Sequence, residues 1–150
     1  MWKKDLQCPI EDIESEIFTK WLEFNWLEVS WHIPNETPTK RKVVDPNSWR
    51  ISWVGGWATN AKNKRKGVKK WIPDHLVVIP AYLCSEDRDL LLFVEMKRQN
   101  GVPSDVKPEQ RVWLEALDKV ADVATFVAFG AKPACEFVAQ YLKNPKIFEF

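Results

Sequence analysis

A carboxylate and a lysine two positions apart form the first candidate site in the sequence. Glu95 and Lys97 close the apolar run 90–97. In a β-strand alternate side chains share a face, so Glu95 and Lys97 would lie together while Val94 and Met96 point into the core. This arrangement places an acidic and a basic group side by side at the open end of a sheet.

A second carboxylate, Asp74, follows Pro73 at the start of the preceding apolar run. Pairing of the two runs in a hairpin would bring Asp74 beside Glu95. Two carboxylates and a backbone carbonyl, here that of Met96, are the hard oxygen ligands that Mg²⁺ prefers. Such a metal polarises a phosphodiester and lowers the pKa of a bound water, which Lys97 would orient or deprotonate. The pattern indicates metal-dependent phosphodiester hydrolysis, with Mn²⁺ able to substitute for Mg²⁺.

Each part of this pattern also has a structural interpretation. The triplet Asp105-Val106-Lys107 repeats the acid-x-Lys spacing, but prolines flank it and favour a loop. Asp74 alone would suit a loop cap, and Glu95 with Lys97 alone would suit an exposed ion pair at a strand edge. Their combination on adjacent strands, downstream of a basic segment, favours a site.

That basic segment is hidden by the nearly neutral total charge of +1. Residues 1–39 carry a net charge of −5, residues 40–71 a net +9 and residues 72–150 a net −3. The densest cations are Lys62, Lys64, Arg65, Lys66, Lys69 and Lys70. Such a run can release counterions from a nucleic-acid backbone, although a solvated basic loop is the alternative.

Local patterns predict the elements that must position these residues. Apolar residues at helical spacing begin with Ile13 and continue with Ile17, Trp21 and Phe24. We expect helices over 10–28, 108–119 and 133–142, and strands over 30–33, 75–80, 90–97 and 123–129. Residues 36–71 are predicted to be loop, with a short helix after Asp45-Pro46. The order of elements predicts one mixed α/β domain over 1–150.

The length and the cysteines limit the class of protein. A chain of 150 residues suits one domain. No apolar run approaches the roughly 18–20 residues of a membrane span, and the first residues lack the apolar stretch of a secretory signal. Three widely spaced cysteines provide neither a disulfide framework nor a metal knuckle. We therefore expect an intracellular, cytoplasmic protein.

Seven short motifs, in order over nearly the whole chain, carry a family resemblance. They are Ser15-Glu16-Ile17, His32 to Glu36, Lys66 to Asp74, Phe93 to Lys97, Gly101 to Ser104, Gln110 to Leu114 and Val127 to Ala134. Together they resemble the VRR-NUC nucleases of the PD-(D/E)xK superfamily, which includes restriction enzymes and archaeal Holliday junction resolvases. The resemblance implies a restriction-endonuclease-like core, a central mixed β-sheet flanked by helices. A stand-alone domain of this size is similar to the virus and phage members.

The resemblance also implies residue roles. It implies a Mg²⁺-dependent DNA endonuclease in which Asp74 and Glu95 bind the metal and Lys97 is the catalytic lysine. Gln110 matches a glutamine that helps to hold the site, with a plain surface helix residue as the alternative. Glu16 corresponds to a helix glutamate that approaches the metal.

Other positions leave alternatives or depart from the family pattern. Glu14, on a different helix face, competes with Glu16, and a solvated glutamate is the structural interpretation of either. Trp71 stands where the family often has glycine, so the turn before the acidic motif is expected to differ. His75 replaces an aliphatic residue and is interpreted as a tolerated strand-start residue, with a supporting role in the site or a DNA contact as alternatives. His32 is expected to form structural hydrogen bonds.

The expected substrate is a four-way DNA junction. Its two symmetric scissile strands require two active sites. Because each chain has one site, we expect a homodimer. The viral-type resolvases that this chain resembles are also dimers. Trp49, Trp53 and Trp57 recur every four residues and would line one helix face, as dimer anchors or as cover for the sheet. Arg98, next to Lys97, joins the basic segment as a DNA contact. Alternatives are a flap, nicking or restriction-like nuclease, or a non-catalytic DNA-binding module.

Overall fold

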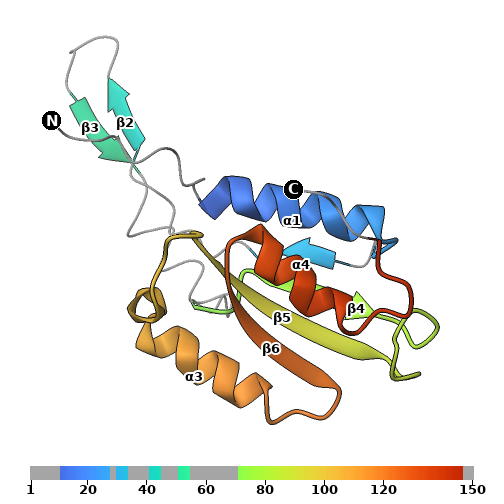
Figure 1. The fold of residues 1–150 in the computed structure, drawn as a ribbon. Coiled ribbons are helices and arrows are strands. Elements are labelled where there is room, and N and C mark those ends of the chain that lie inside the picture. Colours follow the sequence, from blue (N-terminus) through green and yellow to red (C-terminus); the bar gives the residue numbers. More distant parts are fainter. Residues whose placement is uncertain (1–10, 28–29, 34–40, 45–50, 55–70, 147–150) are drawn as a thin grey trace, which may run out of the picture. The chain divides into compact units, whose positions relative to one another are not determined.

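The computed structural model describes residues 11–27, 30–33, 41–44, 51–54 and 71–146. The chain divides into two compact units, residues 34–70 and the remainder. The larger unit contains α1 (Glu11–Phe24), β1 (Ser30–His32), β4 (His75–Ile79), β5 (Leu90–Lys97), the 3₁₀ helix η1 (Pro103–Asp105), α3 (Pro108–Leu117), β6 (Val123–Phe129) and α4 (Ala131–Ala139), shown in Figure 1. The smaller unit contains β2 (Arg41–Val44) and β3 (Ile51–Val54).

The larger unit is built on a four-stranded mixed sheet with the order β1-β4-β5-β6. Strand β4 pairs antiparallel with both β1 and β5, whereas β5 and β6 are parallel. The short connection between β4 and β5 makes them a hairpin, and the longer one through α3 makes β6 parallel to β5. The predicted mixed α/β class and the predicted hairpin are therefore confirmed.

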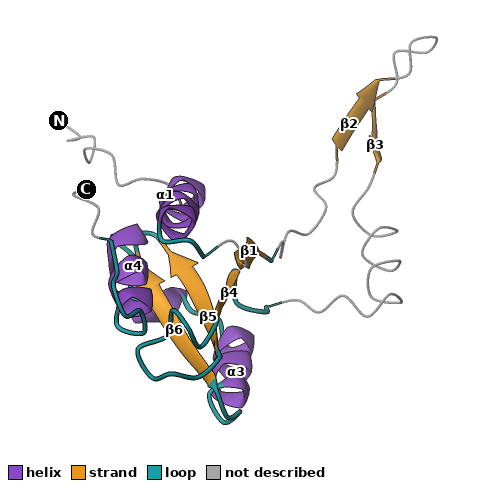
Figure 2. Cartoon of the chain, turned by 90° about the vertical axis from the view of Figure 1, so that its right-hand side faces the viewer, coloured by secondary structure: helices purple, strands orange, loops and turns teal. Residues whose placement is uncertain are grey.

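Helices cover both faces of this sheet. Figure 2 shows α1 and α4 on one side and α3 on the other. The side facing α1 and α4 contributes Val94 and Met96 to the core, and both are fully buried. Because side chains alternate along a strand, Glu95 and Lys97 lie on the opposite side, the side of α3. The predicted division of strand β5 into two faces is confirmed.

Helix α1 buries part of the predicted stripe, because Trp21 is 3% exposed and Ile17 packs against the core. Its buried apolar residues include Phe18 and Leu22, whereas Ile13 and Phe24 of the predicted stripe are 45% and 46% exposed. Glu14 also lies on the buried face, where its Oε2 accepts a hydrogen bond from the Ala131 amide at 2.6 Å. That amide belongs to the first turn of α4, where backbone N–H groups favour a carboxylate.

Helix α1 ends in a left-handed turn. The Leu27 amide donates to the Leu22 carbonyl at 3.0 Å, and the Trp26 amide donates to the Glu23 carbonyl at 3.1 Å. This is the Schellman pattern, in which the residue after the helix adopts a left-handed conformation. Trp26 has a φ of 63°. Glycine is the usual residue there, because a side chain in this conformation costs about 1–2 kcal/mol.

The smaller unit shows where the predicted loop was wrong. Strands β2 and β3 pair antiparallel, with Arg41 opposite Val54 and Val44 opposite Ile51. Their β-branched residues favour extended structure. Trp53 lies on β3, so a helical stripe through Trp53 is wrong. Trp49, Trp57 and the basic segment lie outside the described residues.

Two glycines allow the loops after β5 and β6 to approach closely. A Cβ on Gly101 would meet the Arg98 carbonyl oxygen and the Phe129 ring at 2.9 Å. Gly130 has a φ of 99° and lies against Gln99. These loops leave the sheet at the end where Glu95 and Lys97 lie. Among the described helices, none is long and apolar enough to cross a membrane.

Candidate active site

Asp74 and Glu95 meet at the end of the hairpin. The ladder between β4 and β5 ends with His75 opposite Val94, so Asp74 and Glu95 are the next residues across it. Oδ2 of Asp74 accepts a hydrogen bond from the Met96 amide at 3.0 Å. The side chain of Asp74 is thereby tied to the strand that carries Glu95. The predicted juxtaposition of the two carboxylates is confirmed.

The carboxylate of Glu95 is buried, with only 1% of the residue exposed. Its Oε1 accepts hydrogen bonds from Lys97 Nζ at 2.5 Å and from Gln110 Nε2. Its Oε2 is buried with no hydrogen-bond partner among the described residues. An exposed ion pair at a strand edge is thus the wrong interpretation of Glu95 and Lys97.

The pKa values of this pair follow from burial and from neighbouring charges. Burial and then the charge of Asp74 raise the pKa of Glu95 to about 7, although Lys97 opposes the change. Burial alone would lower the pKa of Lys97, but the hydrogen bond and charge of Glu95 outweigh it and raise that pKa. Lys97 is therefore an ammonium at neutral pH. In this arrangement it provides positive charge and hydrogen-bond donors.

Gln110 connects α3 to the buried carboxylate. Pro108 begins the helix, where its missing N–H is not needed. One turn in, Oε1 of Gln110 accepts the Lys107 amide at 2.9 Å while its Nε2 donates to Glu95. Gln110 is buried, so the alternative of a surface helix residue is wrong. Its two hydrogen bonds fix the position of the amide and thereby orient Glu95.

Helix α1 brings Glu11 toward the site. Burial raises the pKa of Glu11. The positive charge of Lys97 lowers this pKa, the negative charge of Asp74 raises it, and the positive charge of Arg98 lowers it. The charge of Glu11 in turn contributes to the raised pKa of Glu95. Glu11 is therefore the α1 carboxylate in electrostatic contact with the cluster.

The two glutamates expected from the sequence lie elsewhere on α1. Glu14 caps α4, as described above. Glu16 is exposed and lines a hollow of about 470 Å³ together with Lys20 and His75. Glu16 as a metal ligand stays a prediction. Glu11 precedes Phe18 by seven residues, so it lies near the helix face that carries Phe18.

Three further residues near Asp74 can be placed. His75 is 2% exposed, and its ring meets the Phe18 ring edge-on, with centroids 5.2 Å apart. This burial excludes an exposed DNA contact and agrees with a structural strand-start residue. Trp71 has a φ of 68°, the left-handed conformation that suits glycine. His32 pairs with His75 through the backbone of β1.

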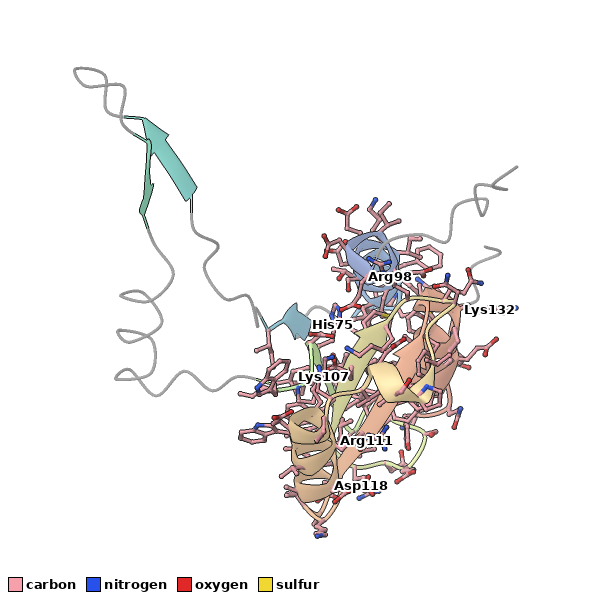
Figure 3. The ribbon with its side chains drawn as sticks, turned by 90° about the vertical axis from the view of Figure 1, so that its left-hand side faces the viewer. His75, Arg98, Lys107, Arg111, Asp118 and Lys132 are labelled. Carbon is pink, nitrogen blue, oxygen red and sulfur yellow. The ribbon has the colours of Figure 1, made fainter. Side chains whose placement is uncertain are left out.

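Basic side chains lie around this end of the sheet. Figure 3 shows Arg98 near α1, Lys107 at the start of α3 and Lys132 on α4. All three residues are exposed. Arg98, expected to contact DNA, directly follows the site lysine. Lys107 and Lys132 were not predicted to contact DNA, because neither belongs to a basic run in the sequence.

One oxygen atom of the site, Oε2 of Glu95, suits a ligand of a hard cation. The buried Oε2 of Glu95 is an acceptor without a donor, and buried acceptors are rarely left unsatisfied. Asp74 and the Met96 carbonyl are the other expected ligands. Across the described part of the chain, no group of three or more His, Cys, Asp or Glu side chains is arranged to hold a metal. A metal at this position would therefore be held by two carboxylates together with backbone and water oxygens.

Comparisons with known proteins gave no match to a protein-family model, a curated protein or a solved structure. The residues of the site therefore carry the functional interpretation.

Proposed function

We propose that this chain is a metal-dependent DNA endonuclease of the VRR-NUC type, with a restriction-endonuclease-like core. The observation that carries the proposal is the buried Glu95 carboxylate, which has one oxygen bonded to Lys97 and Gln110 and the other without a donor. Asp74 lies directly across the ladder from it. Structural stability alone gives no reason to bury a carboxylate in this way.

In the proposed reaction Asp74, Glu95 and the Met96 carbonyl would hold Mg²⁺, which when bound would supply Lewis acidity at the scissile phosphate and lower the pKa of a water. Lys97 carries positive charge next to Glu95 and opposes the negative charge that develops on the phosphoryl oxygens. Gln110 holds the orientation of Glu95 through its hydrogen bond.

The proposed substrate is a branched DNA, most simply a four-way junction cut by a homodimer. The basic run from Lys62 to Lys70 and the exposed Arg98 provide the charge for the phosphate backbone. A flap, nicking or restriction-like nuclease is the alternative, because the same site residues would serve it. A non-catalytic DNA-binding module accounts less well for the carboxylate pair.

A cleavage panel tests this proposal. Purified protein is incubated with Mg²⁺ and labelled four-way junction, flap, single-stranded or duplex DNA, and the products are resolved on gels. Asp74→Asn and Lys97→Ala are expected to bind junctions like the parent but to cleave them at least about 100-fold more slowly. Asp105→Asn and Lys119→Ala are matched controls on exposed residues outside the site. EDTA should stop cleavage, and Mn²⁺ should restore it.

Three outcomes would contradict parts of the proposal. Undiminished cleavage by either site variant would refute the assigned site. Cleavage of linear duplex as fast as of junctions would refute the junction preference. Tight binding without cleavage of any DNA at any metal concentration would favour the binding module.

A further inference from the structure

The end of α1 exposes two aromatic residues around a lysine. Phe24 is 46% and Trp26 66% exposed. Nζ of Lys146 lies 4.9 Å from the centroid of the Phe24 ring and 4.6 Å from that of the Trp26 ring. Both distances are within the range of a cation–π interaction. We call Phe24, Trp26 and Lys146 the aromatic–lysine cluster.

The backbone conformation of Trp26 is unfavourable for any residue with a side chain. Trp26 occupies the left-handed position of the Schellman turn, where glycine avoids the steric cost. Most of the residue is exposed, so burial of the ring offsets little of that cost. Trp26 is mostly exposed and its backbone conformation costs free energy of folding. This combination suggests a role in binding.

Lys146 is held in place by a segment distant in sequence. The buried Asn25 accepts the Lys146 amide at 2.7 Å through Oδ1 and donates to the Lys146 carbonyl at 3.3 Å through Nδ2. The same Nδ2 donates to the Trp21 carbonyl at 3.0 Å. Among the described residues Lys146 forms no ion pair, and its exposed ammonium lies over the two rings.

We propose that the aromatic–lysine cluster binds an unpaired nucleotide of single-stranded DNA. The base would stack on Trp26 or Phe24, and the ammonium of Lys146 would contact the adjoining phosphate. Exposed aromatic rings beside a cation are the recurrent features of single-strand binding surfaces. Bases within a duplex are already stacked on one another, so the cluster selects unpaired DNA. The choice of DNA as ligand rests on the proposed nuclease function.

The cluster lies well away from the candidate active site. Glu11 and Phe24 are the first and last residues of α1, which at about 1.5 Å per residue places them roughly 20 Å apart. A DNA that reaches both must offer its scissile strand at one point and an unpaired segment at another. Branched DNA with a single-stranded arm, such as a flap, has this property, whereas linear duplex and a fully paired four-way junction do not. The cluster would thus contribute to recognition of DNA structure by the proposed nuclease.

Fluorescence anisotropy tests the cluster directly. The whole chain is titrated in EDTA, so that no cleavage occurs, against labelled (dT)₂₀ and against a 20-base-pair duplex. Trp26→Ala is expected to weaken (dT)₂₀ binding by about 5- to 100-fold, from the usual strength of base–aromatic stacking. Duplex binding should stay within about twofold of the parent. Trp26→Phe should retain most of the (dT)₂₀ affinity.

Matched variants separate this site from general surface effects. Tyr82 is 74% exposed, so Tyr82→Ala removes an exposed aromatic ring outside the cluster and should leave (dT)₂₀ binding unchanged. A plot of the logarithm of (dT)₂₀ affinity against the logarithm of salt concentration should be less steep for Lys146→Ala, by about 0.7 in its slope. Lys143 is paired with Asp87, so Lys143→Ala should have a smaller effect.

A stability readout distinguishes binding from structure. Trp26→Gly removes the steric cost, so its Tm should equal that of the parent or exceed it by up to about 4 °C, while (dT)₂₀ binding falls. A lower Tm with unchanged (dT)₂₀ affinity would overturn the proposal and make Trp26 a structural residue. Loss of binding to anionic vesicles instead of (dT)₂₀ would overturn it in favour of a membrane surface.

The two proposals fail separately. If Trp26→Ala loses (dT)₂₀ binding but the parent cleaves no DNA, the cluster stands and the nuclease proposal fails. If the parent cleaves junctions and Trp26→Ala binds (dT)₂₀ normally, the nuclease proposal stands and the cluster fails.

Discussion

Replacement of Glu95 by glutamine tests the buried carboxylate through the pH dependence of stability. Burial and the charge of Asp74 raise the pKa of Glu95 to about 7 in the folded protein, from an ordinary value of 4.5. Below pH 4.5 both the folded and unfolded states hold the proton, and the stabilising contribution is complete. As the pH rises through 7, the folded protein must release a proton that it binds more tightly than the unfolded chain, so stability falls.

The magnitude follows from the two pKa values. A difference between 4.5 and about 7 corresponds to roughly 3 kcal/mol of free energy of unfolding. Glu95 is 1% exposed, so solvent screening reduces this value little. Glu95→Gln has no proton to release, and its stability should lack this fall. Part of this loss has occurred by pH 5, so the parent is expected to lose about 2.5 kcal/mol relative to Glu95→Gln between pH 5 and 8.

Urea unfolding monitored by tryptophan fluorescence measures this difference. Both proteins are unfolded in EDTA at pH 5, 6, 7 and 8, and the difference in their free energies of unfolding is plotted against pH. Both histidines of the chain are present in both proteins, so any contribution from them cancels in the difference. The ion pair with Lys97 forms only where Glu95 is ionised, so its contribution is already contained in the pKa of Glu95.

Two results would refute the reasoning. Parallel stability curves for the parent and Glu95→Gln would show that Glu95 has an ordinary pKa. Addition of Mg²⁺ should raise the stability of the parent more at pH 8 than at pH 5, because the metal binds the ionised carboxylates. An equal effect of Mg²⁺ on Glu95→Gln would exclude Glu95 as a ligand.

Three further substitutions test individual contacts. Gln110→Ala removes the donor to Glu95 and should slow junction cleavage by on the order of tenfold in gel time courses, with unchanged junction affinity as the control. Trp71→Gly relieves a left-handed conformation and should raise the Tm by about 2–4 °C in circular dichroism; a lower Tm would show that the ring packs in the fold. Glu14→Gln removes the charge from the first turn of α4 and should lower the free energy of unfolding by about 1 kcal/mol in urea, whereas Glu136→Gln on the exposed side of α4 should not.

The part of the site that could be predicted from sequence depends on local pairing. Residues 75–79 and 90–97 are separated by a short connection, so a hairpin is the simplest arrangement and fixes Asp74 beside Glu95. The alternation of side chains in β5 then decides which residues share a face. The strand 123–129 was predicted with the bounds that the structure has. The VRR-NUC resemblance stays a prediction.

Errors arose where tertiary contacts determine local structure. The buried position of Glu14 on α1 is stabilised by an amide 117 residues away, which helical spacing alone does not reveal. The strands β2 and β3 were missed because prolines, asparagines and cations around them indicated a loop. Their β-branched residues on either side of the Asp45-Pro46-Asn47-Ser48 turn signal would have predicted a hairpin.

The charges of the cluster support the proposed binding of a divalent cation. The ion pair between Glu95 and Lys97 is neutral as a unit, but Asp74 and Glu11 add two further carboxylates whose charges both raise the pKa of Glu95. Ionisation of all three carboxylates with one buried ammonium leaves a net charge of about −2 at a poorly solvated place. A fold selected for stability alone would replace such a carboxylate by an apolar residue. A divalent cation would neutralise the excess charge and lower the pKa of Glu95, so it would stabilise the ionised form that the proposed reaction requires.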